Sequence, residues 1–226
     1  ELRPGRTPIN TQLISPKEKQ HAFDLIRSEI IKGHQIYVVL PLIEESEKLE
    51  LSAAVDVHHQ LSTFVFSEFT VKLLHGKMKS LEKQDVIQNF VNAKSDILVS
   101  TTVIEVGVDV PNASVMLIED SDRFGLAQLH QLRGRVGRGA SKSYCLLSHQ
   151  NKNKLSRQRL EVLVNSNDGF EISEIDLRLR GPGQVLGTKQ SGLPDFALAS
   201  LIDDHAVLEQ ARDEATKLLN CDPELK

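Results

Sequence analysis

Short apolar runs rich in β-branched residues alternate with longer segments of helical period, and this alternation limits the possible folds most strongly. The six runs lie at residues 11–14, 36–40, 71–74, 96–100, 114–119 and 144–148. Strands that alternate with helices along a chain form parallel sheets with helices on both faces. We therefore predict an α/β domain with a parallel sheet over residues 1–150.

Two of the intervening segments carry clear helix signals. Residues 15–33 begin with a Ser N-cap and a Pro in the first turn, and they close with a Gly. Residues 79–94 open with an imperfect capping box from Ser80 to Lys83. The apolar residues predicted to lie near one face of this second helix are Leu81, Val86, Phe90 and Val91.

The pattern changes after residue 150. Residues 151–168 and 170–181 are both helical by period, and turn residues at 167–169 join them, so we predict a helical hairpin. A glycine-rich loop at 181–195 and an amphipathic helix at 203–220 follow. We assign residues 151–226 to a second region made of hairpin, loop and C-terminal helix.

The segment "QLHQLRGRVGRG" at 128–139 places Arg133, Arg135 and Arg138 among glycines. Arginine suits bidentate recognition of phosphate or carboxylate, and glycine lets a backbone approach a ligand closely. The segment stands between the last two strands, and ligands of such sheets bind beyond the carboxyl ends of the strands. This position favours a phosphate-binding role over a surface turn with solvated arginines.

Charge is distributed unevenly along the chain. Residues 123–189 hold 12 basic and 5 acidic side chains, whereas the whole chain has a net charge of −4. A basic third on an acidic protein is typical of a polyanion-binding face. The 2 cysteines and the scattered histidines indicate neither a disulfide framework nor a metal site, and the apolar runs are too short to cross a bilayer.

The segment at residues 97–113 contains a predicted strand, which is followed by Thr101 and Thr102 and then by Gly107 and Asp109. Hydroxyls just past a strand can donate to phosphates, and a carboxylate shortly after a glycine can hold ribose hydroxyls. The alternative is a strand-to-turn transition in which Asp109 caps a helix.

His75 and Gly76 follow another strand, where backbone amides can hold a nucleic-acid phosphate; the alternative is a simple turn. The tetrapeptide "HGKM" is not an ATP phosphate-binding loop, because no glycine stands five residues before Gly76 and no Ser or Thr follows Lys77. A nucleotide motor needs such a loop and a metal-binding carboxylate. This sequence contains neither.

Two segments, "TTVIEVGVDVP" and "QLHQLRGRVGRG", resemble motifs V and VI of superfamily 2 helicases. The motif VI pattern Gln-x-x-Gly-Arg-x-x-Arg is matched by Gln131, Gly134, Arg135 and Arg138. Residues 40–47, 123–139 and 168–192 resemble the RecG family of branched-DNA helicases. The last of these also resembles the translocation motif of the transcription-repair coupling factor family, Mfd, but "GVDVPNA" and "DLRLRGPG" are closer to RecG.

The resemblance covers nearly the whole chain. It implies a second RecA-like motor domain at 1–150 and a translocation hairpin and loop at 151–226. Arg135 and Arg138 are then expected to contact the terminal phosphates of ATP, with Gly107 and Asp109 at the ribose and Gln131 linking nucleotide to DNA binding. The residues implied for DNA contact or coupling are His75, Gly76, Thr101, Thr102, Arg178, Arg180, Gln184 and Gln190.

Arg178 and Arg180 are two residues apart, so they cannot share one face of a regular helix. We expect one to face the hairpin or a carboxylate such as Glu174 or Asp176, and the other to face duplex phosphate. The alternative is that both are solvated charges at a helix C-terminus, where they favour the helix dipole.

The resemblance predicts an ATP-driven translocase or helicase on branched double-stranded DNA, such as replication forks and Holliday junctions, in DNA repair and recombination. A first RecA-like domain, which carries the Mg²⁺ ligands, and a wedge domain are expected upstream in a cytoplasmic bacterial protein at the nucleoid. Alternatives are the equivalent piece of Mfd, or a non-catalytic DNA- or nucleotide-binding module when the chain is isolated. Alone, the chain is expected to be inactive.

Overall fold

The computed structural model describes residues 8–41, 47–101, 110–139, 142–150, 154–180 and 210. By compactness the chain divides into two units, Glu1–Ile172 and Ser173–Lys226. The sheet and the helices that cover it all belong to the first unit. None of the helices in the described part of the chain combines the length and apolar character that a membrane span requires.

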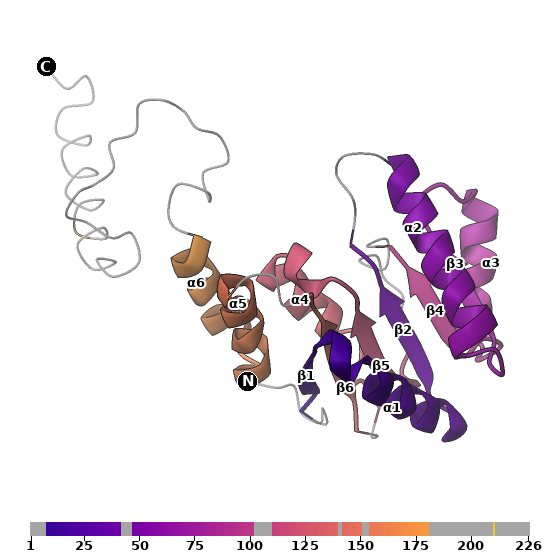
Figure 1. The fold of residues 1–226 in the computed structure, drawn as a ribbon, viewed down its shortest axis with the longest axis horizontal. Helices are drawn as coiled ribbons and strands as arrows, with labels where there is room; N and C mark the ends of the chain where they lie inside the picture. Colours follow the sequence, from indigo (N-terminus) through magenta and orange to yellow (C-terminus); the bar gives the residue numbers. More distant parts are fainter. Residues whose placement is uncertain are drawn as a thin grey trace, which may run out of the picture. The chain divides into compact units, whose positions relative to one another are not determined.

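A six-stranded parallel sheet is the centre of the first unit (Figure 1), with the strand order β1-β6-β5-β2-β4-β3. The predicted parallel α/β fold is therefore confirmed. Strands β2, β4 and β5 are buried along their whole lengths, as expected for strands covered on both faces. The strands are β1 (Asn10–Ile14), β2 (Gln35–Val39), β3 (Val71–Leu74), β4 (Ile97–Ser100), β5 (Ala113–Ile118) and β6 (Tyr144–Ser148).

Helices cover both faces of this sheet. Helices α1 (Lys19–Ile31) and α2 (Glu47–Gln60) pack on one face, where Ile26 and Ala54 share a core with Val38 of β2. Helices α3 (Ser80–Val91), α4 (Leu126–Arg133) and α5 (Lys154–Asn165) pack on the other face, where the neighbouring strand residue Tyr37 contributes. Successive strand residues thus enter opposite cores, as the pleat requires. Short helical turns are η1 (Pro16–Glu18), η2 (Leu61–Val65) and η4 (Ser121–Arg123).

Helix α2 was not predicted from the sequence. Its buried side chain in the core is the small Ala54, whereas the neighbouring Ala53 and Val55 are exposed. The inward face of α2 consists of this small alanine and the half-buried Val57, which gives a weak helical period that the sequence pattern does not reveal.

The predicted apolar face of α3 is partly wrong. Phe90 is buried and Val86 is half-buried, but Leu81 is 79% exposed and Val91 is 43% exposed. The reason is helical geometry, because Val86, Ile87 and Phe90 lie three and four residues apart and define the inward face. The N-terminal cap also begins one residue earlier than predicted.

In that cap, the backbone N–H of Lys79 donates to the Glu82 carboxylate at 3.0 Å. The predicted reciprocal pair of Ser80 and Lys83 is therefore incorrect.

Helices α5 and α6 (Gly169–Arg180) follow β6, as predicted. Leu160 and Leu163 of α5 are buried in the core of the first unit, which continues to Ile172, beyond the predicted boundary at residue 150. Gly169 begins α6 instead of lying in the turn, since the Asp168 carboxylate accepts a 2.8 Å hydrogen bond from the N–H of Phe170. The predicted loop at 181–195 lies outside the described residues, and so does the helix predicted at 203–220, apart from residue 210.

Candidate functional site

The arginine-rich segment lies at the edge of the sheet where the strands begin. A Cβ atom on Gly137 would lie 2.9 Å from Cγ1 of Ile9, which precedes β1. A Cβ atom on Gly139 would lie 2.9 Å from the carbonyl oxygen of Pro111, which precedes β5. We call this region the amino edge; it comprises Ile9, residues 33–35, residues 110–114 and residues 135–139.

This placement corrects the expectation that the segment lies beyond the carboxyl ends of the strands. All strands are parallel, so α4 must carry the chain from the end of β5 back to the beginning of β6. The arginines follow α4 and therefore arrive at the opposite edge. Gly137 has a φ of 77°, which glycine adopts without strain, and Gly139 leaves room for the Pro111 carbonyl.

Three predicted site residues share the end of α4 and the loop after it. Gln131 is exposed in the last turn of α4, Arg135 is half-buried and Arg138 is exposed. The Nε of Arg138 donates a long 3.4 Å hydrogen bond to the carbonyl of Gly134. The structure therefore brings the expected ATP-phosphate residues together at the amino edge.

The other residues expected at the nucleotide, Gly107 and Asp109, lie outside the described residues, as does Thr102. The turn that follows Asp109 is described. It is closed by a 3.0 Å hydrogen bond from the N–H of Ala113 to the carbonyl of Val110.

Arg133 has a different role from the arginines after it. Its side chain is 3% exposed, and its Nη1 donates to the carbonyl oxygens of Leu163 at 2.6 Å and Ser166 at 2.9 Å. These carbonyls belong to the C-terminal end of α5, where backbone acceptors lack helical partners. Arg133 thus binds α4 to α5, and it does not fit the phosphate-binding role first considered for all three arginines.

His130 completes this junction. Its Nδ1 lies 2.8 Å from Nη2 of Arg133, and because a guanidinium only donates, Nδ1 must be the acceptor of a neutral imidazole. Burial lowers the pKa of His130, and the charge of Arg133 lowers it further. A Cβ atom on Gly169 would lie 3.0 Å from Nε2 of His130, so the first residue of α6 packs against the ring.

The opposite edge of the sheet, where the strands end, holds the residues expected to contact DNA. We call it the carboxyl edge. His75 and Gly76 follow β3, and Thr101 follows the neighbouring strand β4. The N–H of Thr101 donates a 3.4 Å hydrogen bond to the carbonyl of Leu74. The sheet therefore brings His75, Gly76 and Thr101 to one place.

Thr101 and Gly76 differ in their surroundings. Thr101 is 1% exposed, and within the described part of the chain its Oγ1 has no hydrogen-bond partner. Gly76 is exposed, and a Cβ atom there would meet no atom within 4 Å. Nζ of Lys83 donates to the Gly76 carbonyl at 2.5 Å, so the loop after β3 is bound to α3.

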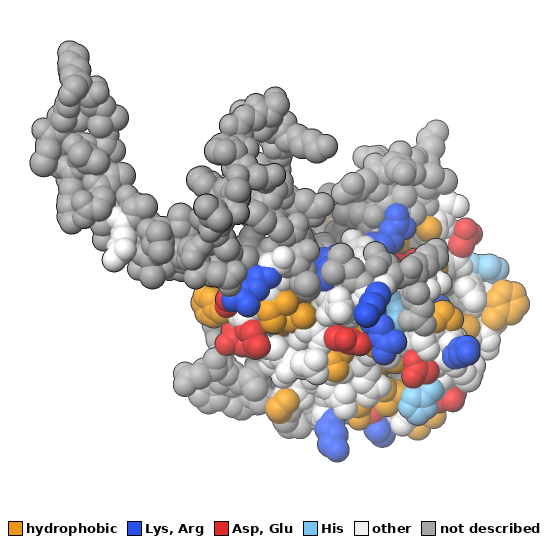
Figure 2. Space-filling view, turned by 60° about the vertical axis from the view of Figure 1, so that its left-hand side comes forward, with side chains coloured by type: hydrophobic (Ala, Val, Ile, Leu, Met, Phe, Trp, Pro, Cys, Tyr) orange, Lys and Arg blue, Asp and Glu red, His pale blue; other side chains and the backbone are white. Residues whose placement is uncertain are grey.

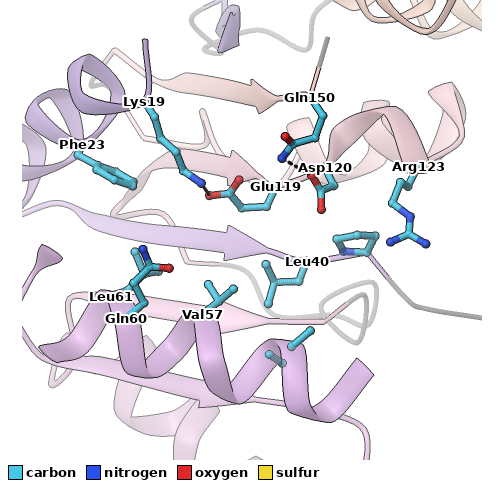
Figure 3. A pocket seen from close by; sticks show the side chains of 13 residues that line it. Lys19, Phe23, Leu40, Val57, Gln60, Leu61, Glu119, Asp120, Arg123 and Gln150 are labelled. Carbon is cyan, nitrogen blue, oxygen red and sulfur yellow. Dashed lines mark hydrogen bonds and ion pairs between the residues drawn. The ribbon is translucent and has the colours of Figure 1, made fainter. Parts of the chain in front are cut away.

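A pocket of ≈ 250 Å³ also opens at the carboxyl edge, between α1 and α2 (Figure 3). Nζ of Lys19 lies 3.0 Å from the carboxylate of Glu119, and Nε2 of Gln150 donates to Asp120 at 3.1 Å. Asp120 has left-handed backbone angles of φ 44° and ψ 47°. None of the predicted site residues lines this pocket, although Leu40, Pro41 and Arg123 of its lining belong to segments that resemble the RecG family.

In α6, Arg178 has a carboxylate partner. Its Nη2 donates to Oε1 of Glu174 at 3.0 Å, which is one of the contacts considered from the sequence. The side chain of Arg180, and all of Gln184 and Gln190, lie outside the described residues.

Basic and acidic side chains are interspersed on the face that Figure 2 shows. Among the described residues, no group of three or more His, Cys, Asp and Glu side chains is placed to hold a metal ion.

Comparison with known proteins identifies two matching families. Residues 19–140 match the helicase conserved C-terminal domain, and residues 166–226 match the C-terminal part of domain 3 of the ATP-dependent DNA helicase RecG. The second match favours RecG over Mfd. An ATP-dependent DNA helicase RecG from Synechocystis sp. is 57% identical over 226 residues, which are 100% of this chain and 27% of that protein. Its counterpart from Bacillus subtilis is 46% identical over 222 residues, which are 98% and 33% of the two proteins.

Solved structures agree with this match. A RecG bound to a three-way DNA junction is 43% identical over 92% of this chain and 27% of that chain, with a TM-score of 0.71. Domain 2 of the Mss116p DEAD-box helicase, solved on an RNA duplex, is 19% identical over 76% of this chain and 69% of that chain, with a TM-score of 0.55, which supports the fold alone. The chain spans about a third or less of the length of the RecG proteins that it matches here.

Proposed function

Because the chain belongs to the family of helicase conserved C-terminal domains, in its RecG branch, we propose that it is the second motor half of an ATP-dependent DNA helicase acting on branched DNA. Forks and Holliday junctions are the proposed substrates, in DNA repair and recombination. The protein that carries this chain is expected in the bacterial cytoplasm, at the nucleoid.

The observation that supports this proposal best is the separation of two residue sets on opposite edges of one sheet. Arg135 and Arg138 lie at the amino edge, whereas His75 and Thr101 lie at the carboxyl edge. A motor domain needs this arrangement, since it must respond to nucleotide on one side and contact DNA on another.

The residues at the amino edge fit a nucleoside triphosphate. Guanidinium groups form bidentate hydrogen bonds with phosphate oxygens, and Gly137 and Gly139 let the loop that carries Arg138 lie close to the beginnings of β1 and β5. ATP bound with Mg²⁺ supplies the phosphoryl group whose transfer to water drives the motor. Arg135 and Arg138 would stabilise the charge that develops on the phosphate, an effect of about 10³–10⁵ in rate where arginine fingers have been measured.

Helix α4 is the structural connection that we assign to coupling. Gln131 lies in its last turn beside the arginine loop, and Arg133 binds its end to α5 at Leu163. A displacement of the loop on nucleotide binding would therefore pull on α5 and on the start of α6. In our proposal this movement reaches DNA through four polar side chains in and after α6, which are Arg178, Arg180, Gln184 and Gln190.

The remaining parts of the machine are proposed to lie in the first RecA-like domain and in a wedge domain of the same protein. The sequence contains no ATP phosphate-binding loop, so the partner motor domain must provide it together with the Mg²⁺ ligands. The wedge domain would supply most of the affinity for the junction.

Two measurements test the proposal. The full-length protein should hydrolyse ATP in response to forked DNA and unwind the fork. The isolated chain should do neither, because half of the ATP site is missing. DNA-stimulated turnover by the isolated chain would contradict the assignment as a half-site, and a full-length protein without DNA-stimulated turnover would contradict the function.

A further inference from the structure

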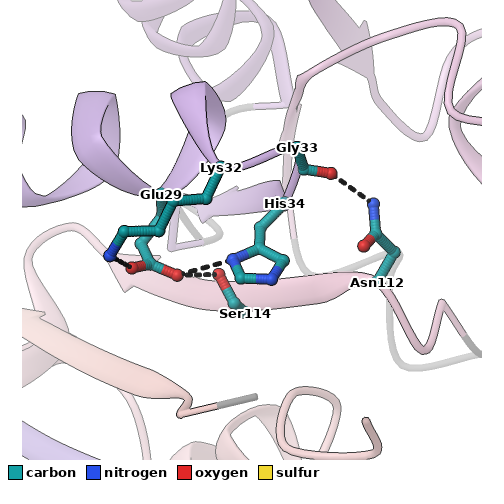
Figure 4. Close-up of polar contacts among 6 residues, drawn as sticks. All are labelled: Glu29, Lys32, Gly33, His34, Asn112 and Ser114. Carbon is teal, nitrogen blue, oxygen red and sulfur yellow. Dashed lines mark hydrogen bonds and ion pairs between the residues drawn. The ribbon is translucent and has the colours of Figure 1, made fainter. Parts of the chain in front are cut away.

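Glu29 is a buried carboxylate at the amino edge, near the end of α1 (Figure 4). It accepts hydrogen bonds from Nζ of Lys32 at 2.7 Å, from Nδ1 of His34 at 2.8 Å and from Oγ of Ser114 at 2.9 Å. Burial raises the pKa of Glu29, but these hydrogen bonds outweigh it and hold the pKa below its ordinary value. The charged carboxylate thus joins α1 to the start of β5.

Asn112 provides a second connection between the same elements. Its Nδ2 donates to the carbonyl of Gly33 at 2.8 Å, and its carbonyl accepts from the N–H of Gln35 at 3.0 Å. Gly33 has a φ of 88° and follows Lys32, the C-terminal cap of α1. The turn between α1 and β2 therefore holds Asn112 by both its side chain and its backbone.

The segment held in this way is the turn from Val110 to Ala113. Asp109, which is expected at the ribose, immediately precedes this turn in the sequence. The carbonyl of Pro111, inside the turn, is the atom that Gly139 of the arginine loop approaches. One short turn therefore borders both sets of residues that we assign to the nucleotide.

We propose that Glu29, Asn112 and Ser114 are positioning residues for nucleotide binding, which act by fixing the turn from Val110 to Ala113. This inference rests on the proposed function. The three residues need not touch ATP. They hold the turn that Asp109 precedes in the sequence and that the loop carrying Arg138 approaches at Pro111.

The main test is Asn112→Asp in the full-length protein. This change keeps the size of the side chain but replaces the donor to Gly33 with a negative charge that the carbonyl oxygen repels. Asn112 is exposed, so the fold should tolerate it. We expect KM for ATP to rise about fivefold and kcat to stay within about twofold, because a ribose contact contributes equally to ground-state and transition-state binding. Ser114→Ala, which removes one donor to Glu29, should act in the same direction. This second variant adds no charge, so it separates the loss of the contact from the effect of the charge on ATP.

Gln20→Ala is the matched control. Gln20 is an exposed amide on α1 that bonds only within its own helix, to Asp24 at 3.0 Å, among the contacts described for it. Its removal should leave both kinetic constants unchanged.

Hydrogen exchange of the 226-residue chain gives an independent readout. In Asn112→Asp, the amides of residue 110, of residues 112–114 and of residues 135–139 should exchange faster, while those of β3 and β4 keep their rates. Unchanged KM in both variants would overturn the inference, and so would faster exchange spread evenly over the sheet, which indicates a purely structural role. A wild-type protein without ATP turnover would instead contradict the proposed function, and the exchange pattern would still decide whether Asn112 holds this turn.

Discussion

Arg133 of α4 donates a 2.6 Å hydrogen bond to the backbone carbonyl of Leu163, near the end of α5. This contact ties the helix that leads into the arginine loop to the helix that leads into α6. It is buried, and the same guanidinium also donates to the carbonyl of Ser166 and to Nδ1 of His130. The junction is therefore both a structural element and the route by which we expect the two ends of the domain to communicate.

Arg133→Ala should lower the free energy of unfolding by about 2–4 kcal/mol, because two buried carbonyl oxygens lose a charged donor. Urea unfolding of the chain measures this loss. Arg157→Ala is the control, since Arg157 is exposed on α5 and pairs with Glu161 at 3.0 Å; it should cost less than about 0.5 kcal/mol. Similar losses in both variants would show that Arg133 does not hold the junction.

His130 should make stability depend on pH as the pH falls through 6.5 towards the lower folded-state pKa of this residue. Its pKa in the folded state is lowered from 6.5, so the unfolded chain binds the proton first as the pH falls. Stability is therefore lost as the pH drops below 6.5 and stops falling below the folded-state pKa. The contribution of this single group cannot exceed about 1.4 kcal/mol per pH unit.

Protonation of Glu29 lowers the stability only at a more acidic pH than protonation of His130, because the pKa of Glu29 is lowered from 4.5. His130→Asn keeps an acceptor for Arg133 and cannot titrate. Its plot of unfolding free energy against pH should be flatter than the wild-type plot, and parallel plots would refute the assignment.

Gly139→Ala should displace the arginine loop, because the new Cβ would lie 2.9 Å from a backbone oxygen that has little freedom to move. We expect a loss of about 1–3 kcal/mol in stability, and a fall of about tenfold or more in ATP turnover of the full-length protein, since small misplacements of reacting groups are costly. Gly76→Ala is the steric control for stability, because its Cβ would meet nothing within 4 Å. Equal stability of the two variants would mean that the loop does not depend on this close approach.

Thr101→Val tests whether the Thr101 hydroxyl contributes only to the fold or also contacts DNA. The buried Oγ1 has no partner within the described residues, so its replacement by a methyl group should leave stability unchanged or raise it by up to about 1 kcal/mol. If Thr101 contacts the DNA backbone, stimulation of the full-length ATPase by DNA should fall.

Thr11→Val is a close match, because Thr11 is also buried with an unpartnered Oγ1 among the described residues, but on β1. The Thr11→Val variant should gain the same stability as Thr101→Val, and DNA should stimulate its ATPase as fully as in the wild type. Loss of stimulation in both variants, or in neither, would argue against a DNA contact at Thr101.

The strands were predictable because a parallel sheet buried on both faces requires continuous apolar runs. The six runs match the six strands to within one residue at each end. Helix α2 was not predictable from the same logic, since it packs on the sheet with only a small buried alanine and the half-buried Val57. The exposed Leu81 shows the converse case, in which an apolar residue in a first helical turn was assigned to the core although it points to solvent.

The candidate site was predictable in its members but not in its arrangement. The motif VI pattern points to Arg135 and Arg138, and the burial of Arg133 shows that this third arginine joins α4 to α5 instead. The edge of the sheet on which the arginines lie depends on whether they precede or follow the crossing helix α4, and the strand pattern does not give the bounds of that helix. The bond between Glu29 and Ser114 joins residues 85 positions apart, so no local spacing could indicate it.

The central claim is that this chain supplies arginines to an ATP site completed by another domain, and Arg138→Ala in the full-length protein tests it most directly. ATP turnover with forked DNA and equilibrium binding to a junction should be measured on the same preparations, with Arg157→Ala as the exposed-arginine control. The account predicts that turnover falls by about 10³ or more while junction affinity stays within about twofold of the wild type. Retained turnover, or a proportional loss of turnover and binding, would contradict it.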